Sequence, residues 1–398
     1  MNYQLSRRYF LKASAALALS QMLLGCSNSI PAIQVLFLEN SIPLRLIKDF
    51  QNTTKEIEID FEPQTQISQI FDRLEKLQQQ KNLEKETESL TDKIFNKSVI
   101  HPSLTTLGDV WLTSAINQNT IQPLSVNDLT NWRKLPEFWQ KLVRRNSQGK
   151  LADNGEIYGA PYRWGSTVIA YRSDKLDKLN LSVRDWQDLW QPELRDRISL
   201  LDSPRETIGL TLKKLGYSYN TENLNSVAGL ETELLELHQQ AKLYSSDHYL
   251  EPLVLGDSWV AVGWSTDILP LLKRYPDIKF VIPQSGASLW ADLWVKPTKS
   301  TEPSIAEDGS MTNIVEQWID YCWKPQAAKQ ISLFTDGISP ILPTLKPEEV
   351  PKDLRDNIFL NSKVLNSDKS EFILPLEAET ERQYRDLWLK IRQSEEKK

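Results

Sequence analysis

The stretch Tyr158–Tyr171 reads Y-G-A-P-Y-R-W-G-S-T-V-I-A-Y. Its first half contains Gly159, Pro161 and Gly165, which are typical of a loop because proline fixes its own φ and offers no backbone N–H. Its second half, Thr167–Tyr171, is β-branched and apolar, which predicts a buried strand. The aromatic residues between the halves combine large flat surfaces with polar ends. The stretch is interpreted either as a cleft wall attached to a scaffold or as a core strand with a packed aromatic at its mouth.

The composition is that of a soluble protein of one large domain or two domains. The chain has 398 residues, of which 40% are hydrophobic and 25% charged. A net charge of -6 gives it no electrostatic affinity for nucleic acid, so we expect no nucleic-acid partner. An acidic protein is compatible with a cationic ligand, and its 13 Trp suit the binding of flat ligands or amines.

The N-terminus carries an export signal. Ser6–Lys12 reads S-R-R-Y-F-L-K, which matches the twin-arginine pattern, and the apolar run Ala13–Leu24 follows it. That run is about half the length that spans a bilayer. It ends in L-L-G-C at Cys26, which resembles a bacterial lipobox. We therefore expect a signal peptide at 1–25, lipidation of Cys26, a linker at 26–32, and a periplasmic protein anchored to a membrane. A buried amphipathic N-terminal helix is the alternative.

The sequence lacks the usual motifs of enzymes and metal sites. With Cys26 assigned to the anchor, Cys322 is left alone and is expected to be a small buried hydrophobe, so no disulfide or cysteine-based metal site is predicted. The histidines His101, His238 and His248 are far apart and form no H-E-x-x-H motif. No G-x-S-x-G elbow, P-loop or G-x-G-x-x-G occurs. We predict no enzymatic activity, no metal and no cofactor.

Strands and helices alternate along the chain, which predicts an α/β fold with ligands near the carboxyl ends of strands. The charge-rich part of the second helix, Lys81–Lys97, is predicted to be a solvated face or an insertion. The predicted strands are Ile33–Leu38, Ile57–Phe61, Leu107–Leu112, Ile198–Leu201, Trp259–Trp264, Phe280–Ile282 and Ser288–Val295. The predicted helices are Pro43–Phe50, Ile67–Lys97, Pro204–Leu215, Leu224–Leu243, Thr312–Cys322, Gln326–Leu333 and Glu377–Lys398.

Aromatic residues and an acid meet near predicted strand ends. Trp264 ends one strand, while Trp290, Asp292 and Trp294 alternate on one face of another. An acid within a strand is costly to bury unless it is paired or bound to something. Aromatic faces with a carboxylate can hold a cationic amine, with each cation–π contact contributing ~0.5–2 kcal/mol. The alternative is that these tryptophans belong to the core.

Six motifs, in this order, resemble the bacterial extracellular solute-binding proteins of the spermidine/putrescine-binding type, which are capture components of ABC importers. The resemblance runs from about Ile33 to about Pro343. The motifs are G-A-P-Y-R-W-G-S-T-V-I-A-Y (159–171), S-V-R-D-W-Q-D-L-W-Q-P-E-L (182–194), L-D-S-P-R-E (201–206), V-A-V-G-W-S (260–265), G-A-S-L-W-A-D-L-W-V-K-P (286–297) and T-D-G-I-S-P (335–340).

The resemblance implies a two-lobed periplasmic-binding-protein fold of type II. Each lobe is expected to be a mixed sheet flanked by helices, with a cleft between the lobes that closes on ligand by hinge motion. The expected bounds are 33–167 and 294–343 for lobe 1, and 168–293 and 344–398 for lobe 2. Val168–Tyr171 is expected to be the first crossing between the lobes, and Trp290–Trp294 the second.

The resemblance also implies a binding site. Trp264, Trp290 and Asp292 match residues that stack on and neutralise a polyamine, and Glu206 matches a second acidic contact. The remaining expected ligand contacts are Glu39, Asn40, Ser41, Thr113, Ser114 and Ser203, and the residues expected at the hinge or cleft edge are Tyr162 and Trp164.

Several positions depart from the polyamine binders. Ser203 stands where they carry an acid, and Ser41, Ala115 and Ile338 stand where they carry tyrosines. These losses put the polyamine itself in question, while Glu39 is a candidate replacement acid.

The sequence thus predicts a monomeric, lipid-anchored substrate-binding component of an ABC transporter. It is expected to deliver a small polar solute, with polyamine-like compounds among the candidates, to a permease and its ATPase. Two alternatives remain open. One is a binder of another organic cation or a metal chelate. The other is an exported non-transport protein, either an enzyme or a structural lipoprotein, on the same fold.

Overall fold

The computed structural model describes residues 33–54, 57–86, 101–126, 129–298, 314–355, 357–361 and 369–394. The expected signal peptide, linker and lipidation site at Cys26 lie outside the described residues, as does the part of Lys81–Lys97 that follows Glu86. Within the described part of the chain, no helix is both long and apolar enough to span a membrane.

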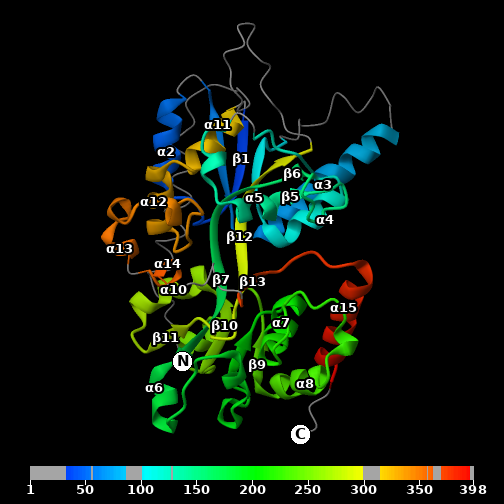
Figure 1. Cartoon of the computed structure of the whole chain (residues 1–398), viewed down its shortest axis with the longest axis vertical. Coiled ribbons are helices and arrows are strands. Elements are labelled where there is room, and N and C mark those ends of the chain that lie inside the picture. The colour runs from blue at the N-terminus through cyan, green and yellow to red at the C-terminus, as the bar shows by residue number, and fades with distance from the viewer. Residues whose placement is uncertain are drawn as a thin grey trace, which may run out of the picture.

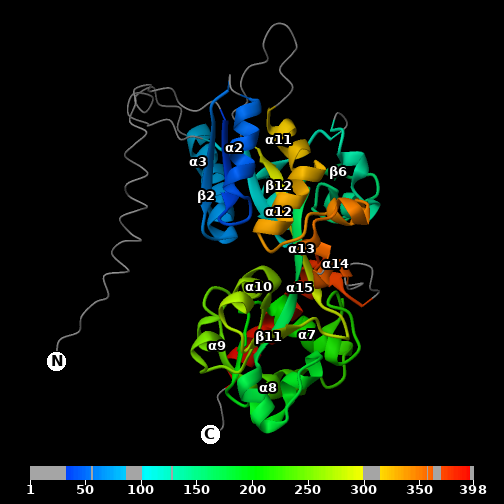
Figure 2. The ribbon, with the colours of Figure 1, turned by 90° about the vertical axis from the view of Figure 1, so that its left-hand side faces the viewer.

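The described chain forms two lobes, one above the other in Figures 1 and 2, joined by long strands. One mixed sheet of 11 strands passes through both lobes in the order β2-β1-β3-β12-β7-β10-β8-β9, with β4 and β13 paired to β12 and β11 paired to β7. Helices flank this sheet in each lobe, so the α/β class predicted from the sequence is confirmed.

Lobe 1 is built on a parallel group of strands. Strand β1 pairs with β2 and β3 and is buried along almost its whole length, which explains its continuous apolar sequence. Its strands are β1 (Ile33–Leu38), β2 (Ile59–Gln64), β3 (Leu104–Gly108), β4 (Ile121–Gln122), β5 (Arg144–Arg145) and β6 (Glu156–Ile157). Its helices are α2 (Leu44–Thr53), α3 (Ile67–Glu86), α4 (Leu112–Asn117), α5 (Glu137–Val143), α11 (Ile314–Cys322), α12 (Pro325–Phe334), α13 (Lys352–Arg355) and α14 (Ile358–Asn361).

Lobe 2 has a parallel group of its own, in which β8 pairs with both β10 and β9. Its strands are β8 (Ile198–Leu200), β9 (Ala241–Tyr244), β10 (Val260–Trp264) and β11 (Ile278–Val281), and the short β13 (Glu371–Phe372) adds to β12. Its helices are α6 (Ser173–Leu176), α7 (Pro204–Lys214), α8 (Leu230–Gln240), α9 (Glu251–Leu255), α10 (Ser265–Arg274) and α15 (Ala378–Arg392).

Two long antiparallel strands, β7 (Ala160–Arg172) and β12 (Ser288–Pro297), connect the lobes. Strand β7 pairs with β12 up to Ser166 and with β10 from Thr167, so it passes from one lobe to the other at this point. Strand β12 pairs with β3 of lobe 1 over Asp292–Val295. Figure 1 shows both strands running through the middle of the molecule.

This topology brings the strand ends of both lobes to one place. Strands β1 and β3 run antiparallel to β12, and β8 and β10 run antiparallel to β7, while β7 and β12 are antiparallel to each other. The carboxyl ends of β1 and β3 therefore point toward lobe 2, and those of β8 and β10 toward lobe 1. Loops and helix starts that follow these strands meet where the lobes join, the place that open α/β sheets use for ligands.

The structure corrects the prediction of a loop over the first half of Tyr158–Tyr171. Ala160–Arg172 is one continuous strand, and Pro161 is tolerated within it because a β-bulge lies there. The register shifts between Asp292 and Leu293, so that Tyr162 is an extra residue of β7. The carbonyl of Pro161 accepts a hydrogen bond from Trp323 Nε1 at 2.6 Å.

Three other element predictions differ from the structure. The strand predicted at Leu107–Leu112 ends at Gly108, and a short 3₁₀ helix at Asp109–Trp111 leads into α4. The helix predicted over Leu224–Leu243 is confined to α8, since the chain turns into β9 at Ala241. Strand β2 begins and ends later than Ile57–Phe61.

The predicted start of α7 is confirmed. Ser203 is the N-cap, with its side chain accepting from the backbone N–H of Glu206, and Pro204 is the first helical residue.

The segment after 343 does not all belong to lobe 2. Helix α13 packs against α12 of lobe 1, whereas α15 packs against α7 and α8 of lobe 2. Phe359 on α14 stacks on Phe280 of β11, with ring centres 6.3 Å apart, so this segment contacts both lobes. The expected assignment of all of 344–398 to lobe 2 is therefore wrong for its first part, where burial of Leu354 and Phe359 in the main core holds the chain.

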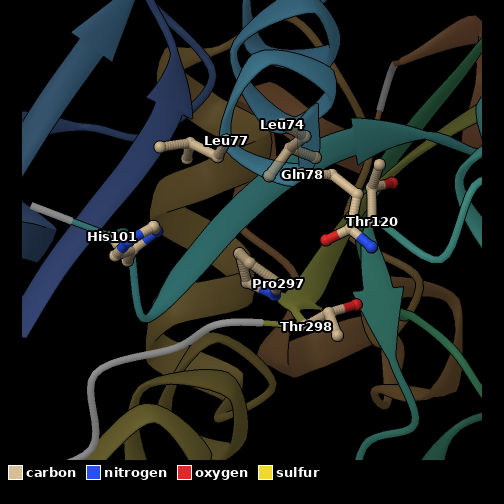
Figure 3. Close-up of a pocket in the computed structure, with 7 residues that line it drawn as sticks. All are labelled: Leu74, Leu77, Gln78, His101, Thr120, Pro297 and Thr298. Atoms are coloured by element: carbon tan, nitrogen blue, oxygen red, sulfur yellow. The ribbon is translucent and has the colours of Figure 1, made fainter. Parts of the chain in front are cut away.

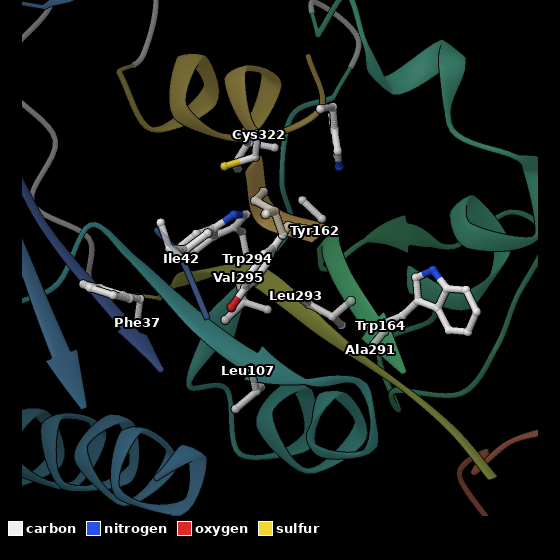
Figure 4. Close-up of a cluster of buried hydrophobic side chains, with 14 of the residues drawn as sticks. Phe37, Ile42, Leu107, Tyr162, Trp164, Ala291, Leu293, Trp294, Val295 and Cys322 are labelled. Atoms are coloured by element: carbon white, nitrogen blue, oxygen red, sulfur yellow. The ribbon is translucent and has the colours of Figure 1, made fainter. Parts of the chain in front are cut away.

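The largest core cluster extends from lobe 1 into the crossing strands. Figure 4 shows Tyr162 beside Trp294, near Cys322, and Trp164 beside Ala291, away from that pair. The rings of Tyr162 and Trp294 are stacked with centres 4.7 Å apart. Cys322 is fully buried, as expected for a small hydrophobe, and burial raises its pKa, so the thiol is not reactive.

Candidate functional site

A buried ion pair connects the two crossing strands. Arg163 on β7 stands opposite Asp292 on β12. Its Nε donates to Asp292 Oδ2 at 2.7 Å, and its Nη2 lies 2.6 Å from the same oxygen. The side chains are only 6% and 4% exposed. Asp292, which the resemblance assigned to ligand, is therefore neutralised by the chain itself.

The pKa shifts of this pair have opposing causes. Burial is the largest single influence and lowers the pKa of Arg163, but the charge and hydrogen bond of Asp292, together with Tyr162 and Asp267, raise it by more, so the guanidinium remains protonated. Burial also raises the pKa of Asp292, and the charge of Arg163 opposes that rise. Because Arg163 is a permanent cation touching the carboxylate, we treat the pair as ionised.

The surroundings of Arg163 are shaped to hold its guanidinium. Its Nη1 donates to the carbonyl of Thr335 at 3.4 Å, and its guanidinium carbon lies 5.8 Å from the centre of the Trp290 ring. A Cβ on Gly337 would lie 2.4 Å from Arg163 Cγ, so only glycine leaves room for the arginine stem. Trp290 is half-buried, and Gly165 opposite it makes room for its ring, since a Cβ there would lie 2.4 Å from Trp290 Cζ2.

Glu206 is also satisfied internally. It lies in the first turn of α7 and is buried. Thr167 Oγ1 on β7 donates to its Oε1 at 3.1 Å, and Ser288 Oγ on β12 donates to its Oε2 at 2.6 Å. Burial raises the pKa of Glu206, and these hydroxyls and Arg205 lower it in part. The carboxylate joins the crossing strands to α7.

Asp267 is different, because this residue is exposed. It lies at the start of α10, after Trp264 ends β10, and Tyr249 donates to its Oδ2 at 2.9 Å. The Tyr249 hydroxyl also accepts from the backbone N–H of Trp264 at 3.1 Å. Desolvation by neighbouring protein raises the pKa of Asp267, and the Tyr249 hydrogen bond and the charge of Arg163 lower it in part. Among the described residues, no ion pair includes Asp267.

Two unpartnered polar atoms lie beside this group. Ser166 Oγ and Trp290 Nε1 are buried and have no hydrogen-bond partner among the described residues. Ser166 is the last β7 residue opposite β12, and its backbone N–H donates to Ser265 Oγ of α10 at 3.3 Å. Buried polar atoms without partners call for an explanation, such as a ligand or water that satisfies them. Trp264, Trp290 and Asp267 therefore form, with these atoms, the candidate binding group at the lobe junction.

The residues expected on the first lobe's cleft loops are placed as follows. Glu39 and Asn40 are exposed directly after β1, and Asn40 has a positive φ of 62°. Ser41 is fully buried and accepts from the Tyr162 hydroxyl at 2.8 Å, so its side chain serves the core. Thr113 Oγ1 donates to the carbonyl of Gly149 at 2.9 Å.

The remaining expected contacts have local hydrogen-bond roles. Ser114 accepts from Gln118 at 3.2 Å on α4, and the Ser203 hydroxyl caps α7.

Tyr162 and Trp164, expected at the hinge or cleft edge, are 0% and 1% exposed and thus lie inside the core. Two positions where the polyamine binders carry tyrosines, Ala115 and Ile338, are also buried. Ile338 pairs with Trp164 through reciprocal backbone hydrogen bonds of 2.9 Å.

A small cavity lies in lobe 1, away from the candidate group (Figure 3). It has a volume of about 10 Å³, and Leu74, Leu77, Gln78, His101, Thr120, Pro297 and Thr298 line it. This volume holds no more than about one water molecule. In the described ranges, no three His, Cys, Asp or Glu side chains gather as a metal site.

Reasoning from the sequence missed Arg163 and Asp267 as functional residues. The charge of Asp292 within an apolar strand pattern was a signal that it needs a partner, but Arg163 lay in a stretch predicted to be a loop. The sequence shows Asp267 only as a polar residue at the start of a helix. Whether a cation lies close enough to pair with it depends on the tertiary structure, so the sequence could not single it out.

Comparisons with known proteins identify the family and the fold of the chain. A family model described as bacterial extracellular solute-binding protein matches residues 100–363. The spermidine/putrescine-binding periplasmic protein of Salmonella typhimurium is 26% identical over 54% of this chain and 56% of its own length. The putrescine-binding periplasmic protein SpuD of Pseudomonas aeruginosa is 26% identical over 71% of this chain and 76% of its own. The chain thus spans about half the length of the first of these curated relatives.

The same fold occurs in solved structures. The spermidine/putrescine ABC transporter substrate-binding protein PotD from Streptococcus pneumoniae superposes with a TM-score of 0.70, 20% identity, and coverage of 90% of this chain and 98% of that one. This similarity confirms the two-lobed periplasmic-binding-protein fold. Since the family model covers well over half of the sequence, the chain belongs to the bacterial extracellular solute-binding protein family.

Proposed function

We propose that the chain is the substrate-binding component of an ABC importer and captures a small polar solute at the lobe junction. The observation that carries this proposal is the convergence of the half-buried Trp264 and Trp290 with the exposed Asp267, at the point where the strand ends of both lobes meet. An aromatic group with an accessible carboxylate suits a small cation, so an amine-bearing solute fits best.

Further ligand contacts are proposed from the same geometry. Ser166 Oγ and Trp290 Nε1 are the polar atoms left for a ligand to satisfy. Glu39 and Asn40, exposed after β1, supply polar groups from lobe 1. The crossing strands β7 and β12 form the hinge about which the lobes close.

The chain's place in the cell is proposed from its N-terminal sequence. The twin-arginine signal directs export, and lipidation of Cys26 holds the protein at a membrane on the periplasmic side, as a monomer that delivers solute to a permease and its ATPase. Replacement of Cys26 by alanine is expected to release the protein from the membrane fraction. Continued attachment would show that the lipid assignment is incorrect.

The proposal is tested by thermal unfolding of the full-length protein with a panel of putrescine, spermidine, monoamines and amino acids. A ligand that binds only the native state stabilises it by about 2.7 kcal/mol at a hundredfold excess over Kd. We expect at least one amine to raise Tm in the wild type and to have a smaller effect on Asp267→Asn. If no member of the panel raises Tm, the amine-binding function fails. If a hit is chemically converted, the exported-enzyme alternative is correct.

A further inference from the structure

At the lobe junction, the guanidinium of Arg163 lies where a cationic ligand would be expected to bind. A carboxylate, an aromatic face and a backbone carbonyl are the groups that recognise an amine or guanidinium. Asp292, Trp290 and Thr335 provide these three groups, and Arg163 occupies the position between them. The arrangement has the chemistry of a ligand subsite that is permanently filled.

The position of the Arg163 side chain is fixed by the fold. Arg163 stands opposite Asp292 because of the β7–β12 register, and the bulge at Tyr162 sits beside it. Gly337 leaves the space that the arginine stem needs. Displacing the guanidinium would leave the buried Asp292 carboxylate unpaired, which is strongly unfavourable. Arg163 therefore does not move aside for a ligand amine.

The charges that remain define the ligand. Asp292 is neutralised by Arg163, and Glu206 is held by hydroxyl groups of both crossing strands. Asp267 is left as the exposed carboxylate beside Trp264, within the electrostatic influence of Arg163. A second ammonium group directed at Asp292 would meet the Arg163 cation that already pairs with this carboxylate.

We propose that Arg163 fills one cation position of the site and thereby restricts the ligand to a single cationic centre, which Asp267 recognises. This inference rests on the proposed function, because it names the substrate class of the same site. Diamines and longer polyamines are excluded by charge repulsion from Arg163 rather than by a lack of acidic residues.

The test compares putrescine with n-butylamine, which have the same carbon chain and differ by one amine. Titration calorimetry on the full-length wild type is expected to give tighter binding of n-butylamine, by about tenfold or more. Arg163→Ala frees both the space and the Asp292 charge, and is expected to improve putrescine affinity by about tenfold or more. Arg163→Lys keeps the cation and should retain the wild-type preference.

Tighter binding of putrescine than of n-butylamine by the wild type would overturn the proposal, and so would an Arg163→Ala variant without a gain for putrescine. If Arg163→Ala is unfolded alone, the same titration is followed as recovery of the folded circular dichroism spectrum on addition of putrescine. If putrescine does not restore the folded spectrum, the proposal for Arg163 is overturned. Should the wild type bind neither amine, its proposed amine-binding function fails, while the gain in Arg163→Ala still decides the role of Arg163.

Discussion

Two aspartates at the lobe junction, Asp292 and Asp267, have the same chemistry and opposite surroundings. Asp292 is 3% exposed and touches the Arg163 guanidinium at 2.6 Å. Asp267 is open to solvent, and its hydrogen-bonding partner Tyr249 is uncharged. The charge of Asp292 is neutralised by Arg163 within the protein, whereas Asp267 can still attract a cation from outside. An acid near a binding site is therefore a ligand contact only if no residue of the chain already neutralises it.

The largest expected effect is the difference in stability between variants of the two acids. Asp292→Asn leaves the Arg163 cation buried without its counter-charge, so we expect a loss of about 3–5 kcal/mol in the free energy of unfolding. Asp267→Asn changes an exposed group, and its expected effect is within about 0.5 kcal/mol. Urea unfolding of both variants measures the difference. Equal stability of the two would remove the distinction between the acids.

A third acid extends the comparison to pH. Asp109 is buried, accepts from the backbone N–H of Ala291 at 2.9 Å, and has its pKa raised to about 7 by burial, with Arg145 lowering it and Asp292 raising it. The folded state therefore binds a proton that the unfolded state releases above about pH 4. Stability from this group is present below about pH 4 and is lost as the pH rises to about 7, by up to about 4 kcal/mol.

Asp109→Asn keeps an acceptor for Ala291 and removes the ionisation. The difference in unfolding free energy between wild type and Asp109→Asn, measured from pH 4 to 8, should shift steadily in favour of the variant. The pH-dependent contributions of the other buried acids to the unfolding free energy are the same in both proteins, so they cancel in this difference. A difference that stays constant over this range would show that Asp109 is not the titrating group.

A smaller effect is expected from the glycine that makes room for Arg163. A methyl group at Gly337 would lie 2.4 Å from Arg163 Cγ and 2.6 Å from its Cδ, so Gly337→Ala should destabilise the fold by about 1–3 kcal/mol. Gly108→Ala is the control, because its added methyl meets Trp111 at an ordinary 3.4 Å. Combining Gly337→Ala with Arg163→Ala should be less than additive in thermal unfolding. Additive losses would mean that the two residues do not share the space.

The smallest expected change in stability accompanies a change in affinity. Asp267→Asn should weaken, by about tenfold, the binding of any amine that raises the Tm of the wild type, since the ammonium loses the negative charge of its acceptor and keeps only a hydrogen bond to a neutral amide oxygen. Titration calorimetry gives the affinity and thermal unfolding confirms the intact fold. An unchanged affinity would move the ligand-binding acid away from Asp267.

The sequence predicted the elements whose pattern is set locally. Strand β1 follows from a continuous apolar run, and the start of α7 follows from Ser203 and Pro204 in their cap positions. The strand through Pro161 was missed, because a bulge and a tertiary hydrogen bond from Trp323 make the proline acceptable there. The 3₁₀ helix at Asp109–Trp111 was missed, because Leu107–Leu112 was predicted to be a single strand.

The candidate site was predictable only in part. The position of Asp292 within an apolar strand indicated that it needs a partner, and the resemblance assigned that partner to a ligand. Which cation pairs with it depends on the β7–β12 register, including the shift at Tyr162, and no local pattern encodes that register. Trp264 and Trp290 remain half-buried at the junction, while Trp294 of the same strand pattern is enclosed by the core.

The central claim is that Arg163 and Asp292 neutralise each other, and a double-mutant cycle tests it most directly. Unfolding free energies are measured for the wild type, Arg163→Met, Asp292→Asn and the double variant. We predict a coupling free energy of about 2–3 kcal/mol, with the double variant no less stable than Asp292→Asn alone. Additive losses, with a coupling free energy near zero, would contradict the account. Asp292 would then again be a candidate ligand-binding acid.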